Sequence, residues 1–120
     1  MKYNQFKVYK DSKDLVVRIF RLTRKFDREY FYLSDQINRS ALSIILNIAE
    51  GSAKSSNKDF NRYILNALGS ATELSAALEI ARDLRLVDEK IFNETNSCLL
   101  EIIKQLGGFS KFLKENIKKL

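Results

Sequence analysis

The chain has 120 residues, a length that fits one domain, and we expect a single domain over residues 1–120. It is 45% hydrophobic and 30% charged with a net charge of +6, which is typical of a folded soluble domain and excludes a disordered chain. Because no apolar stretch is long enough to span a bilayer and the first residues lack the apolar core of a signal peptide, we expect a cytoplasmic protein without a membrane partner.

Helical periodicity runs through nearly the whole sequence, which contains no proline and only four glycines. The first predicted helix spans about residues 11–26, with Asp11 as its N-cap. The second begins after Ser34 and ends at Gly51. Short polar connections follow both segments, so neighbouring helices are expected to run antiparallel.

Two further helices are predicted in the second half of the chain. Ser56 and Asp59 have the spacing of a capping box, so the third helix should start there and end near Leu84. Asp88 caps the fourth, which Gly107-Gly108 is expected to kink or fray. Its predicted inward side consists of Ile91, Cys98, Ile102, Leu106, Phe109 and Leu113. Together the four segments predict an all-α, antiparallel up-down four-helix bundle.

The second helix is apolar around more of its circumference than one buried face requires. One apolar stripe runs through Ile37, Ala41, Ile44 and Ile48, and a second lies about 120° round the helix. Two neighbouring helices of the same bundle could cover both stripes. An exposed second stripe would instead favour self-association, and we prefer this interpretation. The candidate oligomer interface consists of Leu42, Ile45, Leu46 and Ala49.

Polar side chains of the second and third helices should face each other when these helices fold back as a hairpin. The expected partners are Gln36 with Glu73, Ser43 with Asn66, Asn47 with Arg62, Ser40 with Ser70, and Glu50 with Lys58 or Arg62. These residues form either two solvated faces or a buried hydrogen-bonded network that fixes the helix register and lines a pocket. The candidate network consists of Gln36, Ser43, Asn47, Glu50, Arg62, Asn66, Ser70 and Glu73.

Several motifs resemble those of the 23S rRNA intervening-sequence proteins, a family of small bacterial four-helix-bundle proteins. The most specific is Asn-Ile-Ala-Glu-Gly at residues 47–51, and the similarity extends through residues 58–63 and 67–74. Ile45-Leu46 departs from the family pattern, which usually has a proline followed by a small residue.

The family resemblance implies a left-handed antiparallel bundle that assembles into a ring, with a homopentamer as the expected form. The resemblance also implies a nucleic-acid enzyme, such as a reverse transcriptase, as a partner. Related accessory proteins of diversity-generating retroelements share the fold and cooperate with a reverse transcriptase and its RNA. The family name records the location of a gene within ribosomal RNA genes and does not define an activity.

Positive charge is concentrated in the two terminal segments. Residues 1–28 contain nine basic and three acidic residues, and residues 101–120 contain five basic and two acidic residues. The first and last helices of a bundle can be neighbours, so these segments are expected to form one basic surface for structured RNA or DNA. The candidate nucleic-acid-binding residues are Lys10, Lys13, Arg18, Arg21, Arg24, Lys25, Arg28, Lys111, Lys114 and Lys118.

Aromatic residues accompany the basic residues near the N-terminus. Tyr3, Phe6 and Tyr9 either pack on the bundle or stack on unpaired nucleotides. The sequence leaves both roles open for these three side chains.

No arrangement of residues in the sequence indicates catalysis. There is no histidine, and the single cysteine, Cys98, is expected in the core with no base to activate it. Residues 51–56 lack the glycine spacing of a phosphate-binding loop. We therefore expect no enzyme, no cofactor and no metal site. Two functions remain: an oligomer that binds RNA or DNA, or a protein-interaction scaffold or accessory subunit without direct nucleic-acid contact.

Overall fold

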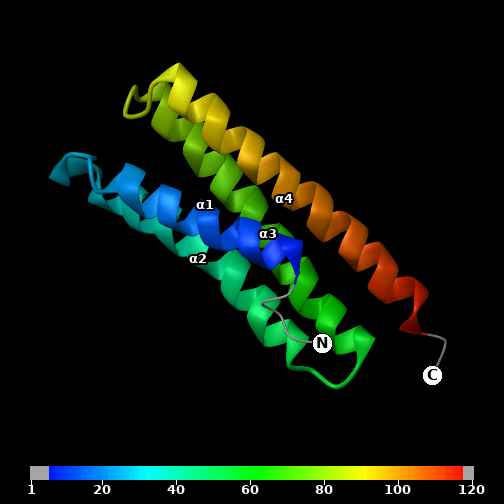
Figure 1. The fold of residues 1–120 in the computed structure, drawn as a ribbon. Coiled ribbons are helices and arrows are strands. Elements are labelled where there is room, and N and C mark those ends of the chain that lie inside the picture. Colours follow the sequence, from blue (N-terminus) through cyan, green and yellow to red (C-terminus); the bar gives the residue numbers. More distant parts are fainter. Residues whose placement is uncertain (1–5, 118–120) are drawn as a thin grey trace.

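The computed structural model describes residues 6–117 of the chain. Within this range the chain forms helices α1 (Lys7–Thr23), α2 (Phe31–Ser52), α3 (Asn57–Asp83) and α4 (Glu89–Glu115), with the short 3₁₀ helix η2 (Arg28–Tyr30) before α2. Consecutive helices pack against each other and α1 also packs against α4, which closes the bundle. The bundle measures 52 × 21 × 20 Å (Figure 1). The prediction of an all-α antiparallel four-helix bundle is confirmed.

The connections divide the bundle into two distinct ends (Figure 1). The α1–α2 and α3–α4 connections lie at one end, which we call the two-loop end. The α2–α3 connection, the start of α1 and the end of α4 lie toward the other, which we call the one-loop end. Residues close to either end can therefore meet although they are far apart in the sequence.

The core is a column of aliphatic side chains to which all four helices contribute. Ile19, Ile44, Leu74 and Leu99 each have no solvent-exposed surface. On each helix the buried residues recur at three- and four-residue steps, as an inward helical stripe requires. Burial of each such side chain contributes about 1.5–3 kcal/mol, so this column is the main source of the fold's stability.

Helix α1 begins at Lys7 and ends at Thr23, so the prediction of residues 11–26 was wrong at both ends. At the start, the Phe6 ring packs 5.0 Å from that of Phe109 and fixes the chain entering the helix. Asp11 lies inside the helix rather than capping it, because its carboxylate accepts hydrogen bonds from Lys7 Nζ and Gln105 Nε2, both at 2.7 Å.

The hydrogen bonds at the helix ends explain the other boundaries. Ser56 Oγ accepts from the backbone N–H of Asp59 at 3.1 Å, and Asp88 Oδ1 accepts from that of Ile91 at 2.8 Å, so both predicted caps are confirmed. Helix α2 begins at Phe31, earlier than predicted, because η2 leads directly into it.

The predicted inward side of α4 was wrong for Ile91 and Cys98, which are exposed. Phe92, Thr95 and Leu99 are buried in their place. The rotation of α4 follows from its packing on α3, where the Arg82 guanidinium lies 4.5 Å from the centre of the Phe92 ring and Ser110 Oγ donates to Asn61 Oδ1 at 2.6 Å. The expected break at Gly107-Gly108 is also wrong, because α4 continues through both residues to Glu115.

Candidate nucleic-acid interface

Four exposed cations lie where α1 ends and η2 begins. They are Arg21, Arg24, Lys25 and Arg28, which we call the α1 basic cluster. Within residues 6–117 none of them forms an ion pair shorter than 4 Å. The charge of this cluster is therefore available to a polyanion in solution.

The other candidate cations lie elsewhere on the bundle. Lys10 and Lys13 are exposed in the N-terminal half of α1. Arg18 Nη1 lies 3.8 Å from Glu94 Oε2 of α4, so the charge of Arg18 is partly compensated. Lys111 and Lys114 are exposed on α4, and Lys118 lies outside the described residues.

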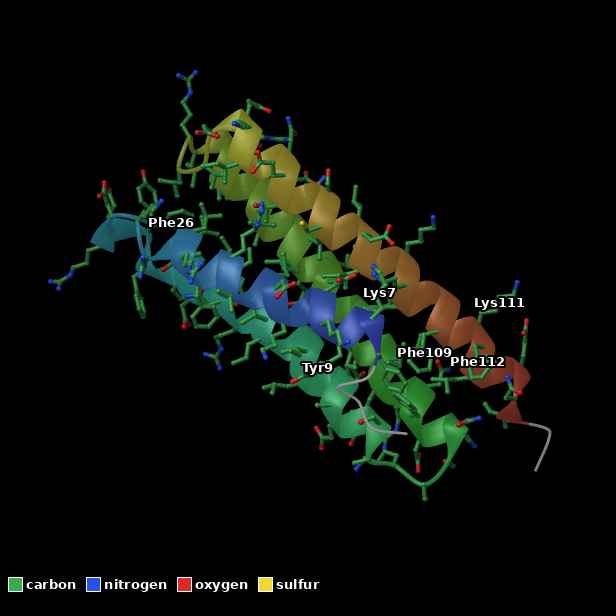
Figure 2. The ribbon with its side chains drawn as sticks, viewed as in Figure 1. Lys7, Tyr9, Phe26, Phe109, Lys111 and Phe112 are labelled. Atoms are coloured by element: carbon green, nitrogen blue, oxygen red, sulfur yellow. The ribbon has the colours of Figure 1, made fainter. Side chains whose placement is uncertain are left out.

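The α1 basic cluster and the α4 lysines, Lys111 and Lys114, do not form the single basic surface that we expected. Glu94 lies beside Arg18, whereas Lys111 is 17 residues, or about 25 Å, further along α4. Figure 2 shows Lys111 toward the end of α4, far from Phe26, which lies in the connection after α1. The α1 basic cluster is therefore at the two-loop end and the α4 lysines are at the one-loop end.

Acidic residues lie between these basic regions, in a groove of about 500 Å³ between α1 and α4. Its lining includes Asp11, Asp14 and Glu101, with Arg18 as a basic member. Hydrogen bonds from Lys7 and Gln105 lower the pKa of Asp11, so this carboxylate stays charged near neutral pH. The carboxylates of this α1–α4 groove would repel a phosphate backbone, and they separate the α1 basic cluster from Lys111 and Lys114.

The N-terminal aromatic residues pack on the bundle instead of facing solvent. Phe6 contacts Phe109 edge-on and lies 6.0 Å from the Phe60 ring, and Tyr9 packs against the core. The packing interpretation is therefore confirmed for Phe6 and Tyr9, whereas Tyr3 lies outside the described residues.

Part of the predicted polar network joins α2 to α3. Gln36 Nε2 donates to Glu73 Oε2 at 3.4 Å, as predicted. The hydroxyls of Ser43 and Ser70 are 2.7 Å apart, so Ser43 pairs with Ser70 rather than with Asn66. Asn47 Nδ2 donates to the backbone oxygen of Ser43 at 2.8 Å and to its hydroxyl at 3.1 Å. The Ser43–Ser70 contact joins α2 to α3 through partly buried groups, the Gln36–Glu73 bond joins them at the surface, and the two Asn47 bonds lie within α2 and orient Ser43.

The remaining members of the candidate network face solvent. Asn66 is exposed, and the Arg62 guanidinium lies 4.9 Å from the centre of the Tyr63 ring and 3.8 Å from Asp59 Oδ1 instead of bonding to Asn47. Glu50 is exposed and forms no ion pair with Lys58 or Arg62 in the described part of the chain. The network is therefore smaller than expected and borders a shallow hollow lined by Gln36, Arg39, Ser40, Ser43, Ser70 and Glu73.

Replacing Asn47 with leucine tests whether this network contributes to stability. We expect the free energy of unfolding to fall by about 1 kcal/mol, because Ser43 loses two hydrogen bonds from the amide. The matched control is Asn66→Leu, the same change at an exposed position, with an expected effect within about 0.5 kcal/mol. Urea denaturation compares the two variants, and equal effects would mean that the network is only a solvated face.

The candidate oligomer interface is only partly exposed in the subunit. Leu42 is 39% exposed and Leu46 is 54% exposed, whereas Ala49 is half-buried. Ile45 is buried by the bundle itself, so its assignment to an interface was wrong. The apolar surface left for assembly on α2 is therefore narrower than the sequence predicted.

A model of the 23S rRNA-intervening sequence protein family matches residues 4–108. This chain belongs to that family. Among solved structures, a protein of unknown function from the S23 ribosomal protein family of Bacteroides thetaiotaomicron is 30% identical, with a TM-score of 0.83. That match covers 87% of this chain and 98% of that chain. A comparison with curated proteins finds no match.

Membership of the 23S rRNA-intervening sequence protein family confirms the resemblance seen in the sequence motifs. The family match includes the whole α1 basic cluster and the α2–α3 polar network, whereas Lys111 and Lys114 lie beyond it. Neither the family description nor the similar solved structure states an activity.

Neither a cluster of metal-ligating side chains nor a membrane-spanning helix is found among the described residues of this family member. Within residues 6–117 no three His, Cys, Asp or Glu side chains are grouped so that they could hold a metal ion. In the same range no helix is both long and apolar enough to cross a bilayer. Cys98 lies on the surface of the α1–α4 groove, so its predicted core position was wrong.

Proposed function

We propose that this chain is a non-enzymatic, cytoplasmic, self-associating protein that binds RNA or DNA through the α1 basic cluster. The observation that carries the proposal is the presence of four exposed cations with no ion-pair partner in the described chain, at one end of α1. Such cations bind the phosphate backbone, so binding should depend strongly on salt and weakly on sequence.

Self-association would strengthen this binding. The exposed Leu42 and Leu46 of α2 supply apolar surface for contacts between subunits. A ring, with a homopentamer as the expected form, would present one α1 basic cluster per subunit. Weak contacts at several clusters would then add through avidity on one long nucleic acid. Light scattering measures the mass in solution, and a monomer would contradict this part of the proposal.

Charge reversal tests the nucleic-acid site. In the triple variant R21E, R24E and R28E, we expect the slope of log affinity against log salt to flatten by about 0.7–0.9 for each phosphate that the protein no longer binds. Binding of a labelled structured RNA is measured over a range of salt concentrations. The matched control reverses three lysines at the one-loop end, Lys58, Lys111 and Lys114, and should retain the slope of the original chain.

An unchanged slope in the triple variant would reject the α1 basic cluster as the binding site. It would favour the second candidate function, a scaffold or accessory subunit that contacts a protein such as a reverse transcriptase. The exposed leucines of α2 are the observation that supports this alternative. Under it, Leu46→Glu should abolish partner binding while the charge reversals leave partner binding unchanged.

A further inference from the structure

The two most exposed large apolar side chains of the described residues are neighbours. Phe31 is 67% exposed and Tyr32 is 88% exposed, at the start of α2. Burying an aromatic ring of this size would contribute about 1.5–3 kcal/mol, so the subunit gains no folding stability from leaving both in solvent. We call these two residues the aromatic corner.

The aromatic corner is held in a defined position. The backbone N–H of Tyr30 donates to the carbonyl of Asp27 at 2.9 Å and closes the η2 turn immediately before it. Ser34 Oγ donates to the carbonyl of Phe31 at 3.0 Å. On the other side of η2, Phe26 packs partly buried against the core, so the connection is anchored from both sides (Figure 2). The rings of Phe31 and Tyr32 therefore project from an ordered turn.

The aromatic corner follows directly after the α1 basic cluster. Arg24, Lys25 and Arg28 lie within eight residues of Tyr32, and Asp27 and Glu29 are the acidic residues in the same segment. None of these three cations forms an ion pair within the described chain. Exposed rings close in sequence to unpaired cations can bind the two parts of each nucleotide in a single strand. The rings suit the planar base, and the cations suit the charged phosphate.

We infer that Phe31 and Tyr32 stack on unpaired bases of RNA or DNA whose phosphates are held by Arg24, Lys25 and Arg28. The inference rests on the proposed function and adds a preference for single strands. Bases inside a duplex are already stacked on each other, so they cannot use the rings, whereas both forms of nucleic acid can use the cations.

Alanine variants at the aromatic corner test this preference. Tyr32→Ala and Phe31→Ala are each expected to weaken binding of a labelled single-stranded RNA about tenfold. Binding of the same RNA annealed to its complement should change less than about twofold, because the duplex uses only the cations. Phe112→Ala is the matched control, because Phe112 is 57% exposed on α4 at the one-loop end and should leave both affinities unchanged.

A fluorescent reporter separates stacking from a general change in the surface. The chain contains no tryptophan, so Tyr32→Trp places a single indole at the corner. We expect single-stranded RNA to quench its emission and the duplex to leave it unchanged. Phe112→Trp, at a 57% exposed position on α4 at the one-loop end, is the control that neither RNA should quench.

The outcomes distinguish this inference from the proposed function. If the original chain binds RNA with a salt-dependent affinity that the corner variants do not reduce, the stacking inference fails and the α1 basic cluster stands. If the corner variants change the mass in solution while RNA binding is unaffected, the corner is a contact between subunits and the inference fails. If the original chain binds no nucleic acid, both proposals fail.

Discussion

Gly51→Ala is expected to lower the free energy of unfolding by about 2 kcal/mol. A Cβ atom at Gly51 would lie 2.8 Å from Tyr63 Cβ and 2.9 Å from Phe60 Cδ1, both closer than carbon atoms normally approach. The Tyr63 Cβ is fixed to the backbone of α3, so relief requires the end of α2 to move away from α3. This cost exceeds the gain of up to about 1 kcal/mol that alanine brings to a helix.

Gly69→Ala is the matched control for Gly51→Ala. A Cβ at Gly69 has no neighbour within 4 Å, so the bundle should gain up to about 1 kcal/mol from the better helix former. Urea denaturation of the two variants should therefore show effects of opposite sign. If Gly51→Ala were also stabilising, the close packing of α2 on α3 would not be a rigid feature of the fold.

The architecture could be predicted from the sequence because it depends on local patterns. Ser56 and Asp88 act as caps in the structure, and a cap needs only a suitable side chain and the backbone N–H three residues later. The start of α1 depends instead on Phe6 packing against Phe60 and Phe109. Residues that distant in sequence meet only in the folded bundle, so the predicted start at Asp11 was four residues late.

The rotation of α4 could not be predicted from its own sequence. Two apolar rows lie side by side on this helix, one through Ile91 and Cys98 and the other through Phe92 and Leu99. Periodicity alone does not choose between them. The contact of Arg82 with the Phe92 ring comes from α3, and it accompanies the burial of the second row.

The candidate binding site was only partly predictable, because a charge count for each segment does not show at which end of the bundle the charges lie. The excess of cations in both terminal segments is real, yet Arg21 and Lys111 lie toward opposite ends of the bundle. The aromatic corner was missed because the second helix was expected to begin after Ser34, which left Phe31 and Tyr32 in a loop. The clustering of three cations and four aromatic residues between positions 24 and 32 is the signal in the sequence that could have found it.

Phe109→Ala is expected to lower the free energy of unfolding by about 3 kcal/mol, the largest effect of a single substitution that we predict. Its ring centre lies 5.0 Å from that of Phe6 and 5.1 Å from that of Phe60, in edge-on contacts that join α4 to the start of α1 and to α3. Phe6 provides no side-chain cap for α1, so ring packing is what holds this helix start in place. Urea denaturation measures the decrease in stability.

The matched control is Phe112→Ala, which removes the same ring from a position that is 57% exposed and 6.4 Å from Phe109. We expect this control to change stability by less than about 1 kcal/mol. Folded Phe109→Ala should still bind RNA, because the α1 basic cluster and the aromatic corner lie at the two-loop end, away from the Phe6 and Phe60 rings. Equal destabilisation by both variants would contradict the aromatic packing, whereas failure of the folded Phe109 variant to bind RNA would place the site at the one-loop end.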